Sequence, residues 1–105
     1  MSEAYRRIGF EEAHRLMEQE ESFCFFDVRE EDEYITGHAR GAELFPLGTI
    51  DEDSAEERIP AKDTPLFLYC RSGARSRAAA NKLLSFGYRR VYDLGGLNGW
   101  PYGTE

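Results

Sequence analysis

Several features that define other protein classes are scarce or missing in this sequence of 105 residues. No apolar run approaches the roughly 20 residues of a membrane-spanning helix, so a transmembrane protein is excluded. The first ten residues lack the apolar stretch of a secretory signal, and we therefore expect a cytoplasmic protein. There are only four prolines, and 41% of the residues are hydrophobic, which permits a packed core and excludes wholesale disorder. The length suits a single domain, 1–105.

Cysteine and histidine are too few for the sites that they build in other small domains. Two cysteines, Cys24 and Cys70, cannot form a disulfide framework and suit a reducing compartment as free thiols. The two histidines, His14 and His38, are far apart, so no four ligands have the spacing of a structural zinc site. We expect neither a metal nor an organic cofactor.

Positive charge is in the minority overall, but one segment concentrates it. Thirteen basic and twenty acidic residues give a net charge of −7, which argues against binding to nucleic acid or to anionic membranes. Six basic residues and no acidic one lie between Cys70 and Tyr92. The ordinary interpretation for three of these charges, Lys82, Arg89 and Arg90, is a solvated helix face.

Strand and helix patterns alternate along the chain. Segments 23–28 and 66–70 are nearly continuous apolar runs, typical of strands buried on both faces of a parallel sheet. Weaker strand signals and helical patterns occupy the segments between and around them: strands at 42–45 and 91–94, helices at 10–17, 30–35 and 76–86, and a loop or a helix at 51–58. This order indicates an α/β domain with a central, mainly parallel sheet of about five strands flanked by helices.

Segment 66–80 carries the strongest functional signal. A buried strand ends at Cys70, a short loop with Gly73 follows, and a helix begins. Ligands of open α/β sheets collect at the carboxyl ends of strands, and the unpaired amides and dipole of a helix start bind anions or stabilise a thiolate. With Arg71 and Arg75 beside it, Cys70 is predicted to have a lowered pKa and to act as a nucleophile without a histidine base. Cys24 lies among aromatic residues and is predicted to be a core residue.

Three chemistries use a cysteine in such a loop. A cysteine phosphatase of the common type has an arginine six positions after the cysteine and a histidine before it, where this chain has Ser76 and Tyr69. A C-x-x-C redox pair needs a second thiol at the position of Gly73. Sulfur transfer remains, in which the thiolate attacks a sulfane sulfur and holds it as a persulfide.

Three motifs in order resemble a rhodanese domain, and the resemblance covers almost the whole chain. The first runs from Asp27-Val-Arg29 through Glu33-Tyr34 to Gly37-His-Ala-Arg-Gly-Ala42, with Ala39 in place of a bulkier aliphatic residue. The second is the loop Cys70-Arg-Ser-Gly-Ala-Arg75, and the third is Gly95-Gly-Leu-Asn-Gly-Trp100.

The resemblance implies a three-layer rhodanese-like domain that acts as a sulfurtransferase. Cys70 is then the residue that carries a persulfide, the donor is a small anion such as thiosulfate or a persulfide, and the acceptor is a thiol, a protein thiol or cyanide. The residues expected to bind the substrate, here called the cradle, are Arg71, Ser72, Gly73, Ala74 and Arg75. Two alternatives stay open: a module that carries sulfur or docks a partner without turnover, and, less favoured because related enzymes have one more loop residue, a phosphatase or arsenate reductase.

The other signature residues are expected to be structural. Arg29 and Glu33, four positions apart, are expected to pair if a helix begins near Glu30. Asp27 is expected to make a structural hydrogen bond, His38 to fix a turn, and Trp100 to lie in the core or cap it.

Overall fold

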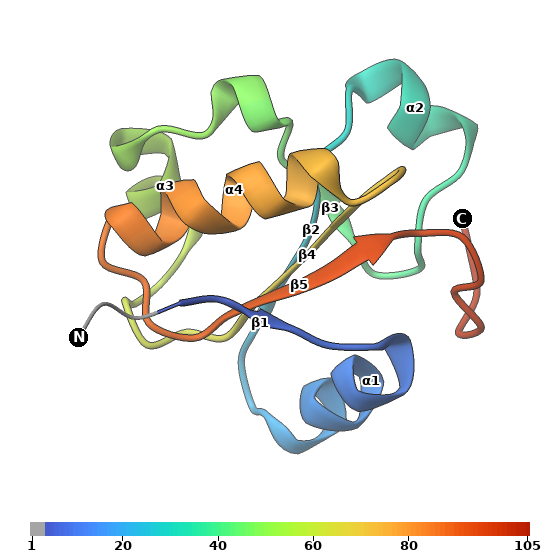
Figure 1. Ribbon diagram of the computed structural model, residues 1–105, viewed down its shortest axis with the longest axis horizontal. Coiled ribbons are helices and arrows are strands. Elements are labelled where there is room, and N and C mark those ends of the chain that lie inside the picture. Colours follow the sequence, from blue (N-terminus) through green and yellow to red (C-terminus); the bar gives the residue numbers. More distant parts are fainter. Residues whose placement is uncertain (1–3) are drawn as a thin grey trace.

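The computed structural model describes residues 4–105 as a parallel sheet between two layers of helices (Figure 1). The elements are, in chain order, β1 (Arg6–Arg7), α1 (Phe10–Gln19), β2 (Cys24–Asp27), α2 (Glu31–Thr36), β3 (Glu43–Leu44), the 3₁₀ turn η1 (Leu47–Thr49), α3 (Glu52–Arg58), β4 (Leu66–Cys70), α4 (Ala74–Ser85) and β5 (Val91–Gly96). The five strands lie in the order β1-β5-β4-β2-β3, and every neighbouring pair is parallel. The predicted α/β architecture is confirmed.

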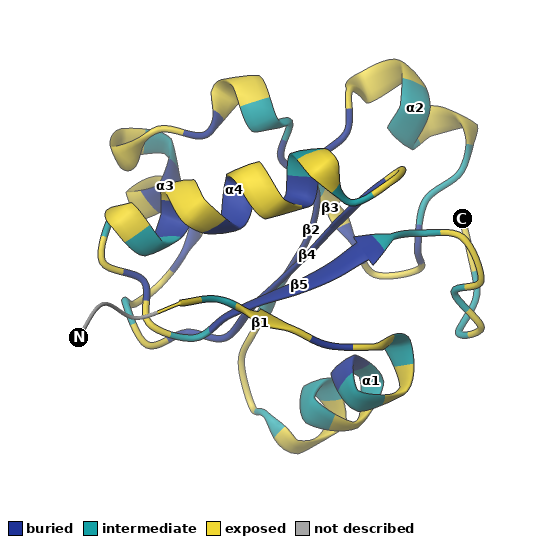
Figure 2. Ribbon diagram, in the orientation of Figure 1, coloured by how far each residue is buried: buried dark blue, intermediate teal, exposed yellow. Residues whose placement is uncertain are grey.

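Side chains of the central strand alternate between two hydrophobic cores. Leu66, Leu68 and Cys70 of β4 pack on the side of α3 and α4, whereas Phe67 and Tyr69 pack on the side of α1. Figure 2 shows the central strands buried and the outer faces of the helices exposed. Burial on both faces explains why this strand is an uninterrupted apolar run in the sequence. Each helix among the described residues is too short or too polar to cross a membrane.

Two segments add detail to the predicted elements. Segment 51–58 contains the helix α3, which starts with a reciprocal cap. The Ser54 amide donates to the Asp51 carboxylate at 2.8 Å, and the Asp51 amide donates to the Ser54 hydroxyl at 3.0 Å. The sequence does not predict β1, because its two residues are exposed arginines at the sheet edge without an apolar pattern.

Candidate active site

The last residue of β4 is Cys70, and the loop that follows it turns back over the thiol. Gly73, the residue before α4, has a φ of +101°, a left-handed conformation that glycine adopts without strain. This conformation brings its amide to 2.9 Å from Cys70 Sγ, to which the amide donates a hydrogen bond. Cys70 exposes no surface, whereas Arg71, Ser72 and Ala74 are exposed. Two of the predicted cradle residues, Ser72 and Gly73, contact the thiol through their backbone amides.

The environment of the thiol favours its ionised form. Burial acts to raise the pKa of Cys70, but hydrogen bonds from the backbone amides of Ser76, Gly73 and Ser72 act in the opposite direction, and the pKa is lowered. These amides belong to the loop and the first turn of α4, where no helical partner is available and the helix dipole adds positive potential. The largest favourable contributions thus come from the amides of the loop and the helix start, as the sequence predicted, whereas the arginine charges that it also suggested are not among them. Ser76 is a site residue that sequence reasoning missed.

Two glycines of β5 let the loop pack closely against the sheet. A Cβ atom on Gly96 would lie 2.5 Å from the carbonyl oxygen of Arg71, so a side chain there would displace the loop. A register shift between β4 and β5 places Cys70 opposite Gly96, and Gly95 has a φ of +79° at that point. The third sequence motif, which begins at Gly95, therefore forms the surface of β5 on which the cysteine loop packs.

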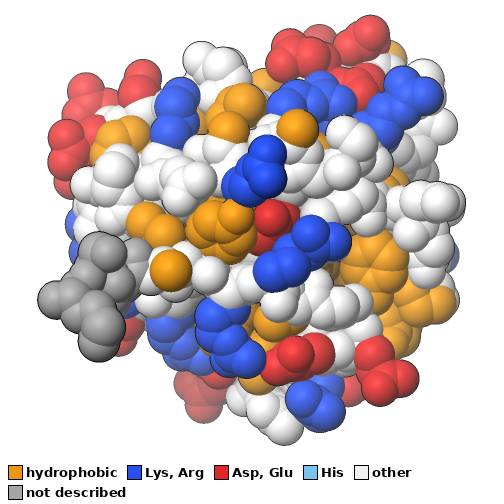
Figure 3. Space-filling model, in the orientation of Figure 1, with side chains coloured by type: hydrophobic (Ala, Val, Ile, Leu, Met, Phe, Trp, Pro, Cys, Tyr) orange, Lys and Arg blue, Asp and Glu red, His pale blue; other side chains and the backbone are white. Residues whose placement is uncertain are grey.

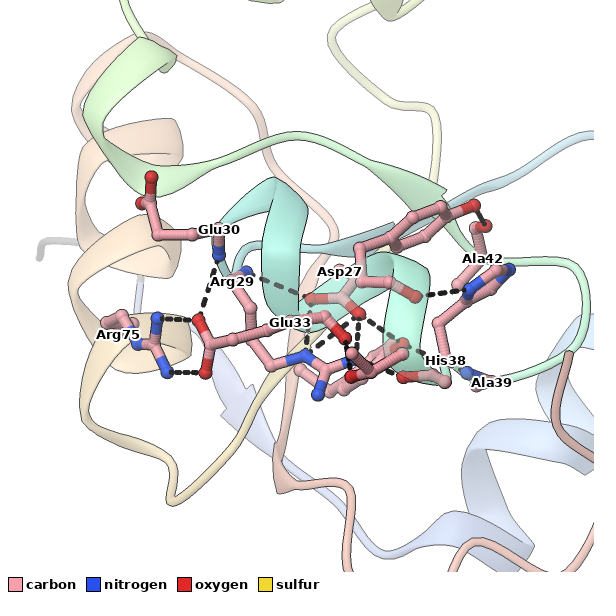
Figure 4. Close-up of polar contacts among 12 residues, drawn as sticks. Asp27, Arg29, Glu30, Glu33, His38, Ala39, Ala42 and Arg75 are labelled. Atoms are coloured by element: carbon pink, nitrogen blue, oxygen red, sulfur yellow. Dashed lines mark hydrogen bonds and ion pairs between the residues drawn. The ribbon is translucent and has the colours of Figure 1, made fainter.

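The guanidinium of Arg75 is held by a carboxylate from another helix. Arg75 Nη1 and Nη2 donate to the two oxygens of Glu33 on α2, at 2.6 Å and 2.9 Å (Figure 4). This contact lowers the pKa of Glu33 to about 2 and raises the pKa of Arg75. The expected pairing of Arg29 with Glu33 is wrong, because α2 turns Glu33 toward α4 and Arg29 has a different partner.

That partner is the buried carboxylate of Asp27 at the end of β2. Arg29 donates to it from Nη2 at 2.7 Å, from Nε at 3.0 Å and from its own amide at 2.9 Å (Figure 4). The Tyr69 hydroxyl donates to the same carboxylate at 2.6 Å, and burial together with this hydrogen bond raises the pKa of Tyr69. Arg29 Nη2 also donates to the carbonyl of Gly37 at 2.7 Å. The prediction of a structural role for Asp27 is confirmed.

The remaining signature residues are also structural. His38 stacks on the Tyr34 ring with centroids 3.6 Å apart, and its Nδ1 lies 2.9 Å from the Tyr34 carbonyl oxygen. Trp100 packs against Phe10 and Phe25, with ring centroids 5.2 Å and 5.4 Å apart. Among residues 4–105, no cluster of three His, Cys, Asp or Glu side chains could hold a metal ion.

The two cysteines are expected to ionise at very different pH. Burial raises the pKa of Cys24 to about 11, whereas that of Cys70 lies below the ordinary value. A pH titration of thiolate ultraviolet absorbance on Cys24→Ser should therefore retain a transition below the ordinary cysteine pKa, because raising the pH through the lowered pKa ionises Cys70. Cys70→Ser should lack that transition. A low-pH transition that disappears in Cys24→Ser instead would contradict the assignment.

Comparison with known protein families gives one match over most of the chain. The model of the rhodanese-like domain matches residues 10–101. The chain is 32% identical to the thiosulfate sulfurtransferase GlpE of Tolumonas auensis, and the match covers 93% of this chain and 90% of that protein. It is 29% identical to the putative sulfur carrier protein YrkF of Bacillus subtilis, over 93% of this chain and 52% of that protein. The chain thus spans nearly all of one relative and about half of the other.

Solved structures give the same fold. The crystal structure of the Alr3790 protein from Anabaena superposes with a TM-score of 0.82 at 29% sequence identity, and the match covers 93% of this chain and 90% of that one. A parallel five-stranded sheet flanked by helices is thus shared with structures of rhodanese-like proteins.

Proposed function

The chain belongs to the rhodanese-like family, and from this premise we propose that it acts as a single-domain thiosulfate sulfurtransferase through a persulfide on Cys70. The observation that carries the proposal is the Gly73 amide at 2.9 Å from the Cys70 sulfur, in a loop whose other amides lower the pKa of the same thiol. A thiolate held by backbone amides at a strand end is a nucleophile that needs no histidine. The name of the GlpE relative supports thiosulfate as the donor.

Sulfur transfer then proceeds in two displacements. The Cys70 thiolate attacks the outer sulfur of thiosulfate, the bond between the two thiosulfate sulfurs breaks, and sulfite leaves with its electron pair. A thiolate or cyanide next attacks the outer sulfur of the persulfide and restores the Cys70 thiolate. The amides of Ser72, Gly73 and Ser76 stabilise the Cys70 thiolate, which is the nucleophile of the first step and the leaving group of the second. Because Cys70 exposes no surface in this conformation, the donor reaches it only when neighbouring side chains move.

The alternatives predict different activities. A phosphatase or arsenate reductase of related type needs a larger loop, whereas the six-residue loop here lies so close to β5 that a Cβ atom on Gly96 would collide with the Arg71 carbonyl. A carrier without turnover accepts sulfur but releases it slowly, and the YrkF relative is named a putative sulfur carrier protein. Steady-state assays with thiosulfate plus cyanide and with an aryl phosphate separate these functions. Turnover of the phosphate ester alone would overturn the proposal, and stoichiometric sulfur uptake without turnover would favour the carrier.

We expect Glu33 to weaken the attraction between the Arg75 guanidinium and an anionic donor. Its carboxylate occupies both terminal nitrogens of the guanidinium, so Glu33→Gln frees a positive charge near the cradle. The pair is partly exposed, and contacts of this kind are worth at most about 1 kcal/mol, so kcat/KM for thiosulfate should rise by about threefold to fivefold. Arg75→Ala should lower the same constant by about tenfold or more.

Two comparisons control for general charge effects. Asp32→Asn removes an equal charge from an exposed position of α2 and should leave thiosulfate kinetics unchanged. Sulfur uptake from a small neutral persulfide should respond weakly to each substitution at Glu33 and Arg75. If Arg75→Ala lowered kcat/KM equally for both donors, Arg75 would support the conformation of the loop and would not bind the charge of the donor.

A further inference from the structure

A buried carboxylate lies beside the cysteine loop and takes no part in the mechanism above. Asp93 of β5 is 2% exposed, and its Oδ1 accepts hydrogen bonds from the Ser76 hydroxyl at 2.6 Å and the Gly95 amide at 2.8 Å. It forms no ion pair with any basic side chain of residues 4–105. The carboxylate borders a cavity of about 300 Å³ that Arg7 and Arg77 also line. Figure 3 shows acidic atoms between basic side chains on this face.

The Ser76 hydroxyl has one proton and more than one possible acceptor. Its Oγ lies 2.6 Å from Asp93 Oδ1, 3.2 Å from the Gly73 carbonyl oxygen and 3.7 Å from Cys70 Sγ. The short contact with a carboxylate is the strongest of the three, so the proton points to Asp93. The oxygen then presents only lone pairs to sulfur. It accepts a hydrogen bond from the neutral thiol and cannot donate one to the thiolate.

We propose that Asp93 is a positioning residue that holds the Ser76 hydroxyl proton away from Cys70 and so keeps the thiolate strongly nucleophilic. The proposal rests on the assignment of Cys70 as the nucleophile of sulfur transfer. Amides stabilise the thiolate, and a thiolate loses nucleophilicity as its pKa falls. Asp93 opposes this loss in two ways, because it withdraws one hydrogen bond from the sulfur and places a buried negative charge behind Ser76.

Other charged groups around the cluster do not neutralise this carboxylate. They come from β1, the loop, α4 and α2, and they are Arg7, Arg71, Arg75, Arg77 and Glu33, while the uncharged phenol of Tyr5 also lines the cavity. Arg75 is paired with Glu33, and Arg7 and Arg77 line the same cavity as Asp93 without an ion pair within the described part of the chain. The charge of Asp93 therefore acts on Ser76 and, through it, on Cys70.

The test is the pH titration of the Cys70 thiolate by ultraviolet absorbance in a Cys24→Ser background. Asp93→Asn keeps the shape of the side chain and an acceptor for the Gly95 amide, but it removes the charge and competes less well for the Ser76 proton. We expect the titration midpoint to fall by about one pH unit. The rate of the fully ionised thiolate with a small neutral disulfide should fall about threefold for that shift. Asp63→Asn removes the same charge from an exposed turn and should change neither value.

A second variant keeps the proposal testable if Asp93→Asn fails to fold. Ser76→Ala should not raise the midpoint, because in the wild-type protein the hydroxyl donates to Asp93 and not to sulfur. The fall caused by Asp93→Asn should also be smaller in the Ser76→Ala background. A midpoint that stays or rises in Asp93→Asn, or that rises in Ser76→Ala, would overturn the proposal. These readouts report thiolate formation and reactivity, so they stand even if thiosulfate is not a substrate.

Discussion

Cys70→Ser is expected to lower sulfur transfer from thiosulfate to cyanide by about a thousandfold or more, to the uncatalysed background. A serine hydroxyl is not ionised at neutral pH by amides that suffice for a thiol, and it forms no persulfide. The substitution exchanges one buried atom for a smaller one, so the fold should survive, which circular dichroism and thermal unfolding check. Steady-state thiocyanate formation is the measurement.

Cys24→Ser is the matched control for this result. Cys24 is half-buried on β2, its pKa is raised to about 11, and it packs against the core on the α4 side. Its replacement should leave kcat and KM for thiosulfate near the wild-type values. Residual activity in Cys70→Ser that disappears in the double variant would place the nucleophile at Cys24 and refute the account.

Asp27→Ala is expected to lower the free energy of unfolding by about 3–5 kcal/mol. The change leaves Arg29 buried without its carboxylate and removes the acceptor of the Tyr69 hydroxyl. A small domain has about 5–15 kcal/mol of stability, so a loss of this size is a large part of the total. Chemical denaturation with an unchanged m-value measures this loss of free energy. The Tm of thermal unfolding should fall by more than about 10 °C.

The double variant Asp27→Ala/Arg29→Leu separates the cost of an unpaired charge from the value of the ion pair. When both charges are replaced by apolar groups, no buried charge is left alone, and much of the lost stability should return. If the double variant were less stable than the wild-type protein by the sum of the two single effects, the pair would not act as a unit. A loss below about 1 kcal/mol for Asp27→Ala would show that the carboxylate is not needed to hold Arg29.

Features that depend on residues close together in the sequence were predictable. The strand β4 is a continuous apolar run in the sequence because both of its faces are buried. Cys70 is its last residue, and Gly73 marks the turn into the next helix. The alternation of strands and helices predicted the parallel sheet for the same reason. In contrast, β1 has no apolar residue, and only its pairing with β5 makes it a strand.

Contacts between distant segments were not predictable from spacing. The helical i,i+4 rule suggested Arg29 as the partner of Glu33, but the actual partner, Arg75, is 42 positions away. Ser76 and Asp93 look like ordinary polar residues in the sequence. Only the packing of α4 on β5 brings the hydroxyl and the carboxylate to 2.6 Å, with the hydroxyl oxygen 3.7 Å from the thiol sulfur. A strand end followed by a helix start is a local signal in the sequence. The side chains that contact Arg75 and Ser76 at this site come from α2 and β5, which are distant in the sequence.

The central claim is that Cys70 holds a transferable sulfur atom, and intact mass spectrometry tests it most directly. The protein is incubated with thiosulfate, desalted and measured before and after treatment with a thiol reductant. We predict that the wild-type chain and Cys24→Ser each gain the mass of one sulfur atom and lose it on reduction, and that Cys70→Ser gains none. An adduct that persists in Cys70→Ser, or a folded wild-type protein that takes up no sulfur from thiosulfate, would contradict the account.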